Sequence, residues 1–459
     1  MPENYVLLER TELNASATSV TFANIPQSGY TDLKVVVSTR LSNTDSPILV
    51  NFNGVTTGYS WRRIYGNGST ASSLSGTDGY FLHGNTSSTT ASTFSNAEFY
   101  VPNYTASQSK SISVDTALET NATAGELFML AALWANNAAI TSISLTPLTG
   151  SFVANSTFSL YGIAALGTTP AIAPKASGGN VIATDGTYWY HAFLSSGTFV
   201  PQTNLSCDYL VVAGGGGGAG QGGGGGAGGY RSFTSQSLST TNYAVVIGAG
   251  GAGGPAGTSG SGALGTKGID SSFNSHTSTG GGLGSNNFAT ASLGSGGSGG
   301  AAGLLDSTNS IGSGNTPSTS PSQGNNSGTT NGTVRAAGGG GGAGAVGGNG
   351  NSSNAGAGGA GSNSLSTWAT ATGTGVSGFY AGGGGGGSDD GSGFTAAGGT
   401  GGSGGGGAGC RGNSTAGGNG VTNTGSGGGG SGNTSGNVNT AAGGAGGSGI
   451  VIIRYPIAS

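Results

Sequence analysis

Long glycine tracts that directly adjoin short apolar runs constrain this chain more than any other feature. The chain has 459 residues and 103 glycines, and about a third of the residues after position 204 are glycine. Before that position glycine is close to the ~7% of ordinary proteins. The boundary is abrupt, since the apolar run 209–213 continues directly into five glycines at 214–218. Glycine at this density forms either a disordered spacer or a solid built from backbone.

The first 167 residues predict an all-β domain. Short runs rich in β-branched and aromatic residues recur there, separated by turn signals such as Asn53-Gly54. Several short strands at this spacing favour a β-sandwich or jelly roll. Residues 122–139 fit either a helix or a buried strand. Residues 168–179 have the Pro, Ala and Gly content of a linker.

The remaining part, 180–459, predicts a strand scaffold with a glycine-rich bundle and exposed loops. Strand signals occur at 181–183, 187–193, 198–200, 209–213, 243–247 and 450–454. A five-residue strand is not stable alone, so we expect these runs to join one sheet. The predicted fold is therefore an N-terminal β-sandwich or jelly roll, followed by a small β-sandwich with long polyglycine II-like insertions.

Three observations favour ordered rods over a flexible spacer. The tracts connect strands that need one another, and disordered insertions would add loop-closure entropy without a gain. Large apolar side chains such as Trp368 interrupt the tracts, whereas residues 214–229 carry almost no side chain. Extended helices with three residues per turn direct N–H and C=O groups outward, so neighbouring rods can satisfy each other's backbone.

Composition excludes several functions. Charged residues make up 6% of the chain and the net charge is -4, so we expect neither nucleic-acid binding nor insertion into a membrane. No apolar run approaches membrane length, and the N-terminus lacks the features of a secretory signal. Cys207 and Cys410 are the only cysteines and form no zinc motif, and whether they pair stays open.

Motifs for catalysis or cofactors are weak. The run 245–253 fits a strand followed by GxGxxG, but Gly254-Pro255 follows where the nucleotide-binding helix would begin. Such matches arise by chance in a glycine-rich chain. The three histidines are far apart, and a glycosidase would need paired carboxylates, whereas few acids follow residue 204. We expect no enzyme activity, no cofactor and no metal.

Several stretches resemble glycine-rich tail-fibre and virion structural proteins of tailed bacteriophages, of the marine or cyanobacterial type. The matching stretches are 48–53, 59–62, 66–69, 98–105, 133–136, 156–163, 182–187, 209–214 and 446–455. This resemblance implies a structural or host-recognition role in the virion after assembly in the host cytoplasm. It implies other virion proteins and a host cell-surface receptor, possibly a glycan, as partners. It also implies a homo-oligomer, with a trimer favoured.

The segments between the tracts, 304–334, 362–380 and 411–439, are predicted to form exposed tips that contact the host. The candidate receptor contacts are Trp368, Phe379, Tyr380, Asn325 and Asn326. Within 1–167, which we expect to dock on the virion or to oligomerise, the candidate virion contacts are Trp61, Arg62 and Arg63. A tail fibre or tail-tip adhesin is the first hypothesis. The alternatives are a capsid decoration or head-fibre protein and, more remotely, a polysaccharide-depolymerising tailspike.

Overall fold

The computed structural model divides the chain into two compact units. The first comprises Met1–Lys175, Asn180–Trp189 and Pro456–Ser459, and the second comprises Ala176–Gly179 and Tyr190–Tyr455. Residues 180–189, predicted to begin the second domain, belong to the first unit because Thr11 pairs with Val181. Residues 168–172 of the predicted linker lie outside the described residues. The structure describes residues 5–120, 125–164, 173–256, 263–286, 294–305, 310–331, 333, 335–391, 393, 395–412, 415–433 and 441–457.

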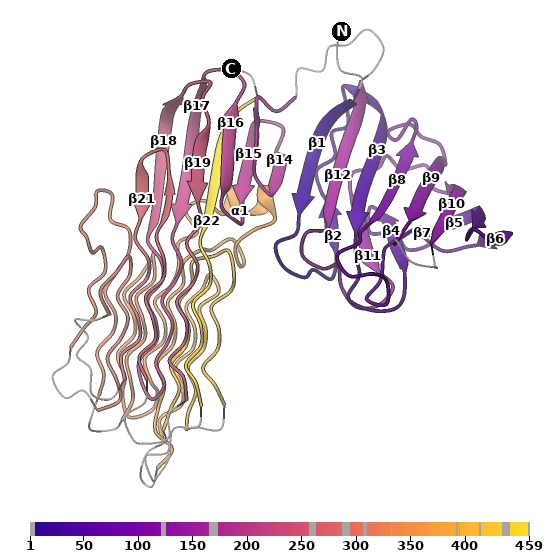
Figure 1. The fold of residues 1–459 in the computed structure, drawn as a ribbon. Helices are drawn as coiled ribbons and strands as arrows, with labels where there is room; N and C mark the ends of the chain where they lie inside the picture. Colours follow the sequence, from indigo (N-terminus) through magenta and orange to yellow (C-terminus); the bar gives the residue numbers. More distant parts are fainter. Residues whose placement is uncertain are drawn as a thin grey trace. The chain divides into compact units, whose positions relative to one another are not determined.

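Two antiparallel sheets form the first unit (Figure 1). The larger sheet contains, in spatial order, β14 (Val181–Thr184), β1 (Tyr5–Glu12), β12 (Thr157–Ala164), β3 (Tyr30–Thr39), β8 (Ser95–Val101), β9 (Lys110–Leu118), β10 (Glu126–Trp134), β5 (Tyr59–Gly66) and β6 (Ala71–Gly76). The smaller sheet contains β2 (Val20–Phe22), β11 (Ile143–Pro147), β4 (Pro47–Phe52) and β7 (Tyr80–His83). Buried apolar residues of both sheets form one core, so the unit is a β-sandwich. The jelly-roll connectivity stays a prediction.

The ambiguous stretch 122–139 contains a strand, β10. Phe128, Leu130, Ala132 and Trp134 are buried and alternate with exposed residues, which is the period of a strand with one face on the core. Trp134 contributes to an aromatic cluster with Phe52 at a ring-centroid distance of 5.4 Å. The helical alternative for this stretch is therefore wrong.

The second unit contains a smaller β-sandwich. One sheet has the order β18 (Tyr230–Leu238), β17 (Leu205–Val212), β22 (Ile450–Pro456) and β15 (Tyr188–Phe193). The other has the order β13 (Ala176–Ser177), β16 (Gly197–Pro201), β19 (Tyr243–Val246), β20 (Ser271–Phe273) and β21 (His276–Ser278). Tyr209 and Phe273 contact edge to face between the two sheets, with centroids 4.9 Å apart.

One expectation about this scaffold is wrong. The runs 209–213 and 450–454 pair as predicted. The runs 198–200 and 243–247 instead form β16 and β19, which pair with each other in the opposite sheet. The prediction of one shared sheet treated all apolar runs as partners. Alternating burial in β19, where Val245 is buried and Val246 exposed, instead fits a strand with a single covered face.

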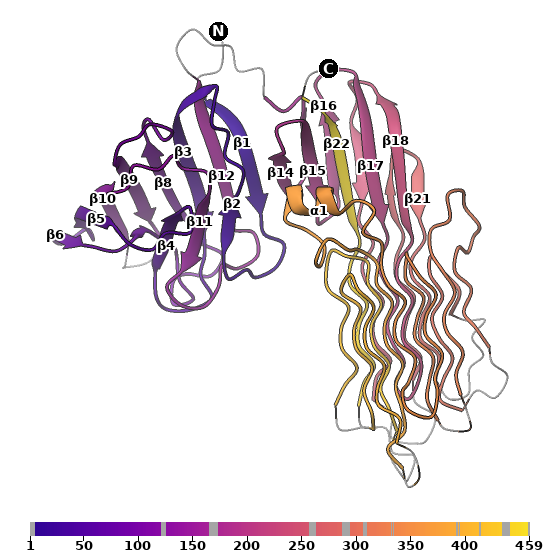
Figure 2. The ribbon, with the colours of Figure 1, turned by 180° about the vertical axis from the view of Figure 1, so that it is seen from behind.

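The glycine tracts are ordered rods that run side by side below the strands of the second unit (Figures 1 and 2). Their hydrogen bonds repeat every three residues. Gly214, Gly217 and Gly220 donate to Ile269, Thr266 and Ala263 of one neighbour, whereas Gly215 and Gly218 donate to Gly447 and Gly444 of another. Gly216 and Ala219 donate to a third, at Gly226 and Gly223. Successive residues of one rod thus bond to three different neighbours, and the pattern repeats every three residues. This is the geometry of the polyglycine II helix.

Close approach of these rods explains why the tracts are glycine. A Cβ atom placed on Gly215, Gly216 or Gly217 would lie far inside the van der Waals radius of a carbonyl oxygen on a neighbouring rod. The predicted all-β fold with a hydrogen-bonded glycine bundle is thus confirmed. Among the described residues, no helix has the length and apolar character needed to cross a membrane.

Candidate functional site

The rods have one end at the sheets and one distal end. The tract that follows β17 reaches a turn at Gln221 and returns to β18. The rod 381–388 ends at Asp389, and the final rod 441–449 leads back into β22. Isolated bridges join the distal ends of four segments, pairing Ala336 with Ser388, Ser388 with Arg411, and Asp389 with Asn433. We define the distal end as 220–221, 331, 333, 335–336, 351–354, 388–391, 411–412 and 431–433.

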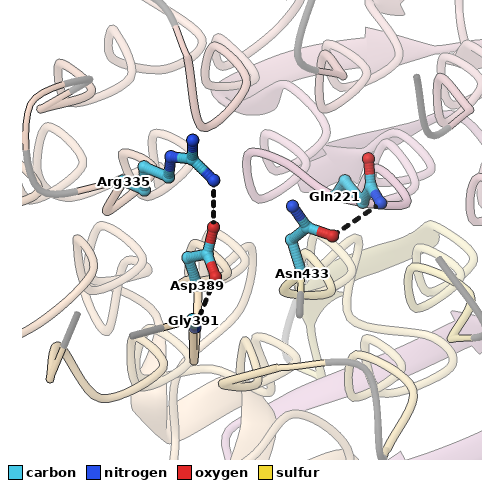
Figure 3. A network of polar contacts seen from close by, with 5 residues as sticks. All are labelled: Gln221, Arg335, Asp389, Gly391 and Asn433. Carbon is cyan, nitrogen blue, oxygen red and sulfur yellow. Dashed lines mark hydrogen bonds and ion pairs between the residues drawn. The ribbon is translucent and has the colours of Figure 1, made fainter. Parts of the chain in front are cut away.

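A charged pair closes part of the distal end (Figure 3). The Arg335 guanidinium donates to Oδ2 of Asp389 at 2.8 Å, and the Asp389 side chain is fully buried whereas that of Arg335 is one-third exposed. The backbone N–H of Gly391 donates to Oδ1 of the same carboxylate at 2.7 Å. Charge-assisted bonds to both oxygens compensate the burial of the anion. The pair therefore holds two distal turns together.

An amide pair lies beside it. Gln221 Nε2 donates to Oδ1 of Asn433 at 2.9 Å, and both side chains are buried (Figure 3). The backbone N–H of Gln221 donates to the hydroxyl of Ser431. Asp390 donates its backbone N–H to the carbonyl of Asn433, which connects the amide pair to the segment of Asp389. Side chains replace the rod-to-rod backbone bonds at the point where the rods end.

Sequence reasoning missed this network. Gln221, Arg335, Asp389 and Asn433 are large polar residues next to glycine tracts, which is the one signal that could have indicated them. No group of three or more His, Cys, Asp or Glu residues suited to a metal ion occurs in the part of the chain that the structure describes.

Polar side chains dominate the exposed surface of the distal end. Residues 351–354 are all exposed, and Oδ1 of Asn351 accepts the backbone N–H groups of Ser353 and Asn354, which fixes this turn. Asp390 and Arg411 are also exposed. This surface offers amides, hydroxyls and one charge of each sign on a rigid backbone, which suits hydrogen bonding to a polar surface.

Two predicted receptor contacts lie elsewhere. Trp368 is on α1 (Ser366–Thr372) at the sheet end of the bundle, 3% exposed, with its ring 6.2 Å from Tyr190 and 4.6 Å from the Arg454 guanidinium. Tyr380 is 0% exposed and shares a hydrogen bond of 2.6 Å with Thr374. A buried ring cannot stack on a receptor, so both are removed as candidates. Their apolar bulk anchors a loop to the scaffold instead.

The other three predicted receptor contacts are also away from the distal tips. Phe379 is half-buried in a tight turn with Val376, in the loop of α1. Asn325 and Asn326 lie along a rod, where the Asn325 side chain donates to the carbonyls of Gly342 and Ala343. Oδ1 of Asn326 accepts the N–H of Gly314. Their amides thus bond to neighbouring rods.

The predicted tips are longer than the real ones. Segment 304–334 contains two hydrogen-bonded rod stretches, in which Gly312 receives a bond from Ser327 and Gly328 donates to Gly339. Segment 411–439 likewise includes a rod at 425–433, and its residues 413–414 and 434–439 lie outside the described residues. Only the short turns between rods are tips, because glycine continues to bond laterally up to the turn.

The predicted virion contacts lie on β5 of the first unit. The Trp61 ring is partly exposed and its Nε1 donates to Asp78 at 2.9 Å. Arg62 is exposed, whereas Arg63 points to the opposite face and donates to Nε2 of His83 at 2.9 Å. Burial, and then the charge of Arg63, lower the pKa of His83 to about 4. Of the three, Arg62 has the most exposed side chain.

Both cysteines are free, so Cys207 and Cys410 do not form the disulfide that the sequence left open. Cys207 is buried, and burial followed by the charge of Asp208 raises the pKa of its thiol to about 12. His191 is fully buried between the Gly178 carbonyl at 2.6 Å and the Tyr455 hydroxyl at 2.9 Å. Burial lowers the pKa of His191 to about 4, so it is neutral and structural.

The fold and its polar distal end define an all-β protein whose glycine tracts assemble into a polyglycine II bundle on a β-sandwich. Residues 194–456 match a family model described as a glycine-rich domain. This match covers more than half of the chain, which therefore belongs to that family. No curated protein matches the sequence.

Proposed function

We propose that this chain is a non-enzymatic structural protein of a bacteriophage virion, acting as a tail fibre or tail-tip adhesin in host attachment. The observation that carries the proposal is the buried contact between Arg335 and Asp389, which holds turns from separate rods together at the distal end. Rods bonded on all sides present these turns on a rigid support. Rigid presentation reduces the ordering entropy lost on binding.

The chemistry of the distal end favours a polar, uncharged receptor such as a glycan. Residues 351–354 offer amide and hydroxyl groups, and the exposed charges of Asp390 and Arg411 are of opposite sign. Recognition would therefore depend on hydrogen bonds and shape. Other virion proteins and further copies of the chain are the partners proposed for the first unit.

Competition for adsorption tests the receptor role. Purified protein should block adsorption of the phage to its host cells, and Ser352→Arg, at an exposed distal turn, should abolish the block. Thr240→Arg is the matched control, because it places the same charge on an exposed turn at the sheet end. Equal blocking by both variants, or no blocking by the wild type, would contradict the adhesin role.

Immunogold labelling of intact particles locates the protein. Label on the tail is expected for a fibre or tip adhesin. Label on the head would instead favour the capsid decoration or head-fibre alternative.

A further inference from the structure

The outer face of the larger sheet in the first unit carries a row of exposed large apolar side chains. Leu127, Met129 and Leu133 alternate with buried residues on β10, so all three lie on the face turned away from the core. Ile64 on β5 is opposite Met129 and widens the row. Their exposed fractions are 59%, 60%, 39% and 63% respectively. Apolar side chains gathered on one surface indicate an interaction site.

A groove on the same face includes part of this row in its lining. It has a volume of about 800 Å³, and its lining includes Ile64, Ser73, Met129 and Ala131 from three neighbouring strands. At its border β6 is the edge strand of the sheet, and five of its six residues are exposed. The edge has no charged residue or proline to discourage pairing. The edge strand at the border of this face therefore lacks the features that discourage pairing with another chain.

Two charges of opposite sign flank the apolar row. Arg62 is opposite Ala131 on one side of β10, and Asp115 is opposite Met129 on the other side. Both are exposed, and neither is in an ion pair within the described residues. The two positions are offset by two residues along the strand, which corresponds to about 7 Å. Opposite charges on both sides of an apolar row form a self-complementary pattern.

We propose that this face binds the same face of a second copy of the chain, about a two-fold axis that runs along β10. Under this two-fold rotation, a residue on one side of β10 lies over the other side of β10 in the second copy. Its height along the strand does not change. Arg62 of one copy then lies over Ser113 of the other, whose neighbour on the same face is Asp115. An extended arginine side chain spans that offset. The two-fold axis repeats the pair, so two Arg62–Asp115 contacts border a shared apolar centre.

A second copy is favoured over an unrelated partner because the charge pattern matches itself. The family resemblance favours a trimer, whereas a face that pairs with itself about a two-fold axis produces a dimer. The proposal concerns only the first unit, so it does not depend on the proposed role in host attachment.

The oligomeric state of the purified full chain, measured by sedimentation velocity over a wide range of concentration, tests this. The wild type should be a dimer. Arg62→Asp and Asp115→Arg should each weaken the dimer, and the double variant R62D/D115R should restore it, because both charges are exchanged together. Met129→Asp should raise the dissociation constant by about 30-fold or more, as expected for a charge in an apolar interface centre.

Leu148→Asp is the matched control, because Leu148 is 45% exposed in the same unit but lies outside this face. It should leave the dimer unchanged. Far-ultraviolet circular dichroism of each variant confirms folding. A monomer or a trimer as the wild-type species, a dimer unaffected by Met129→Asp, or a double variant that stays as weak as the single ones would overturn the proposal.

Discussion

The carboxylate of Asp389 is fully buried and receives the Arg335 guanidinium at 2.8 Å, although the two residues are 54 positions apart in the chain. The backbone reinforces the contact, because the N–H of Asp389 donates to the carbonyl of Arg335 at 3.1 Å. The segment of Arg335 and the segment of Asp389 are therefore coupled at their distal ends by a charge and by a main-chain bond. This coupling leads to the first prediction.

Arg335→Leu should destabilise the second unit by about 1–3 kcal/mol, because it leaves a buried carboxylate without its cation. Asp389→Asn alone should lower the stability of the second unit by less than Arg335→Leu does. The double variant should also be more stable than Arg335→Leu, because no anion then remains buried. Urea unfolding of the three variants measures the coupling. Additive effects in this cycle would show that the two side chains act independently.

Gly217→Ala should disrupt the bundle, with a loss above about 4 kcal/mol, since the new Cβ would overlap the carbonyl oxygen of Ala252. Gly197→Ala is the control, because its Cβ would lie 3.5 Å from the Phe193 ring, at ordinary contact distance. Hydrogen exchange measures the result. Amides 214–229 should be protected in the wild type and in the control, and exposed in Gly217→Ala. Exchange of these amides at random-coil rates in the wild type would mean that the tracts are spacers.

Trp368→Ala should lower stability by about 3–5 kcal/mol, the usual cost of removing a buried large aromatic side chain. The ring contacts Tyr190 and Arg454, so its loss detaches α1 from the scaffold. Thermal unfolding measures the loss. Blocking of phage adsorption, assayed at a temperature where the variant stays folded, should be unchanged. Loss of blocking by a folded variant would instead return Trp368 to the receptor contacts.

The contribution of His191 to the stability of the second unit should fall as the pH is lowered from 6.5 towards 4. Burial lowers the pKa of His191 to about 4 in the folded protein, whereas an unfolded histidine titrates near 6.5. The unfolded chain thus binds more protons in this window, and the difference amounts to about 3 kcal/mol at pH 4. His191→Gln should show a flatter pH dependence in urea unfolding between pH 7 and 4. An unchanged slope would mean that His191 does not titrate differently in the two states.

Much of the fold was accessible from local sequence. Alternating apolar residues predicted the strands, and the absence of side chains in residues 214–218 predicted laterally bonded rods, because only glycine permits that backbone approach. Boundaries between rod and tip were not accessible. Asn325 and Asn326 look like loop residues in sequence, yet they continue a rod, because their amides bond to neighbouring backbone.

By itself, the sequence determined an all-β chain with glycine rods, since both follow from side-chain size and period, which act over a few residues. The tertiary structure alone decided which side chains lie at the distal end. Trp368 is buried because packing places it against Tyr190, and Asp389 is buried because folding brings Arg335 to it. Contacts between residues distant in sequence depend on which rods are neighbours, and uniform glycine tracts carry no local signal that specifies their neighbours.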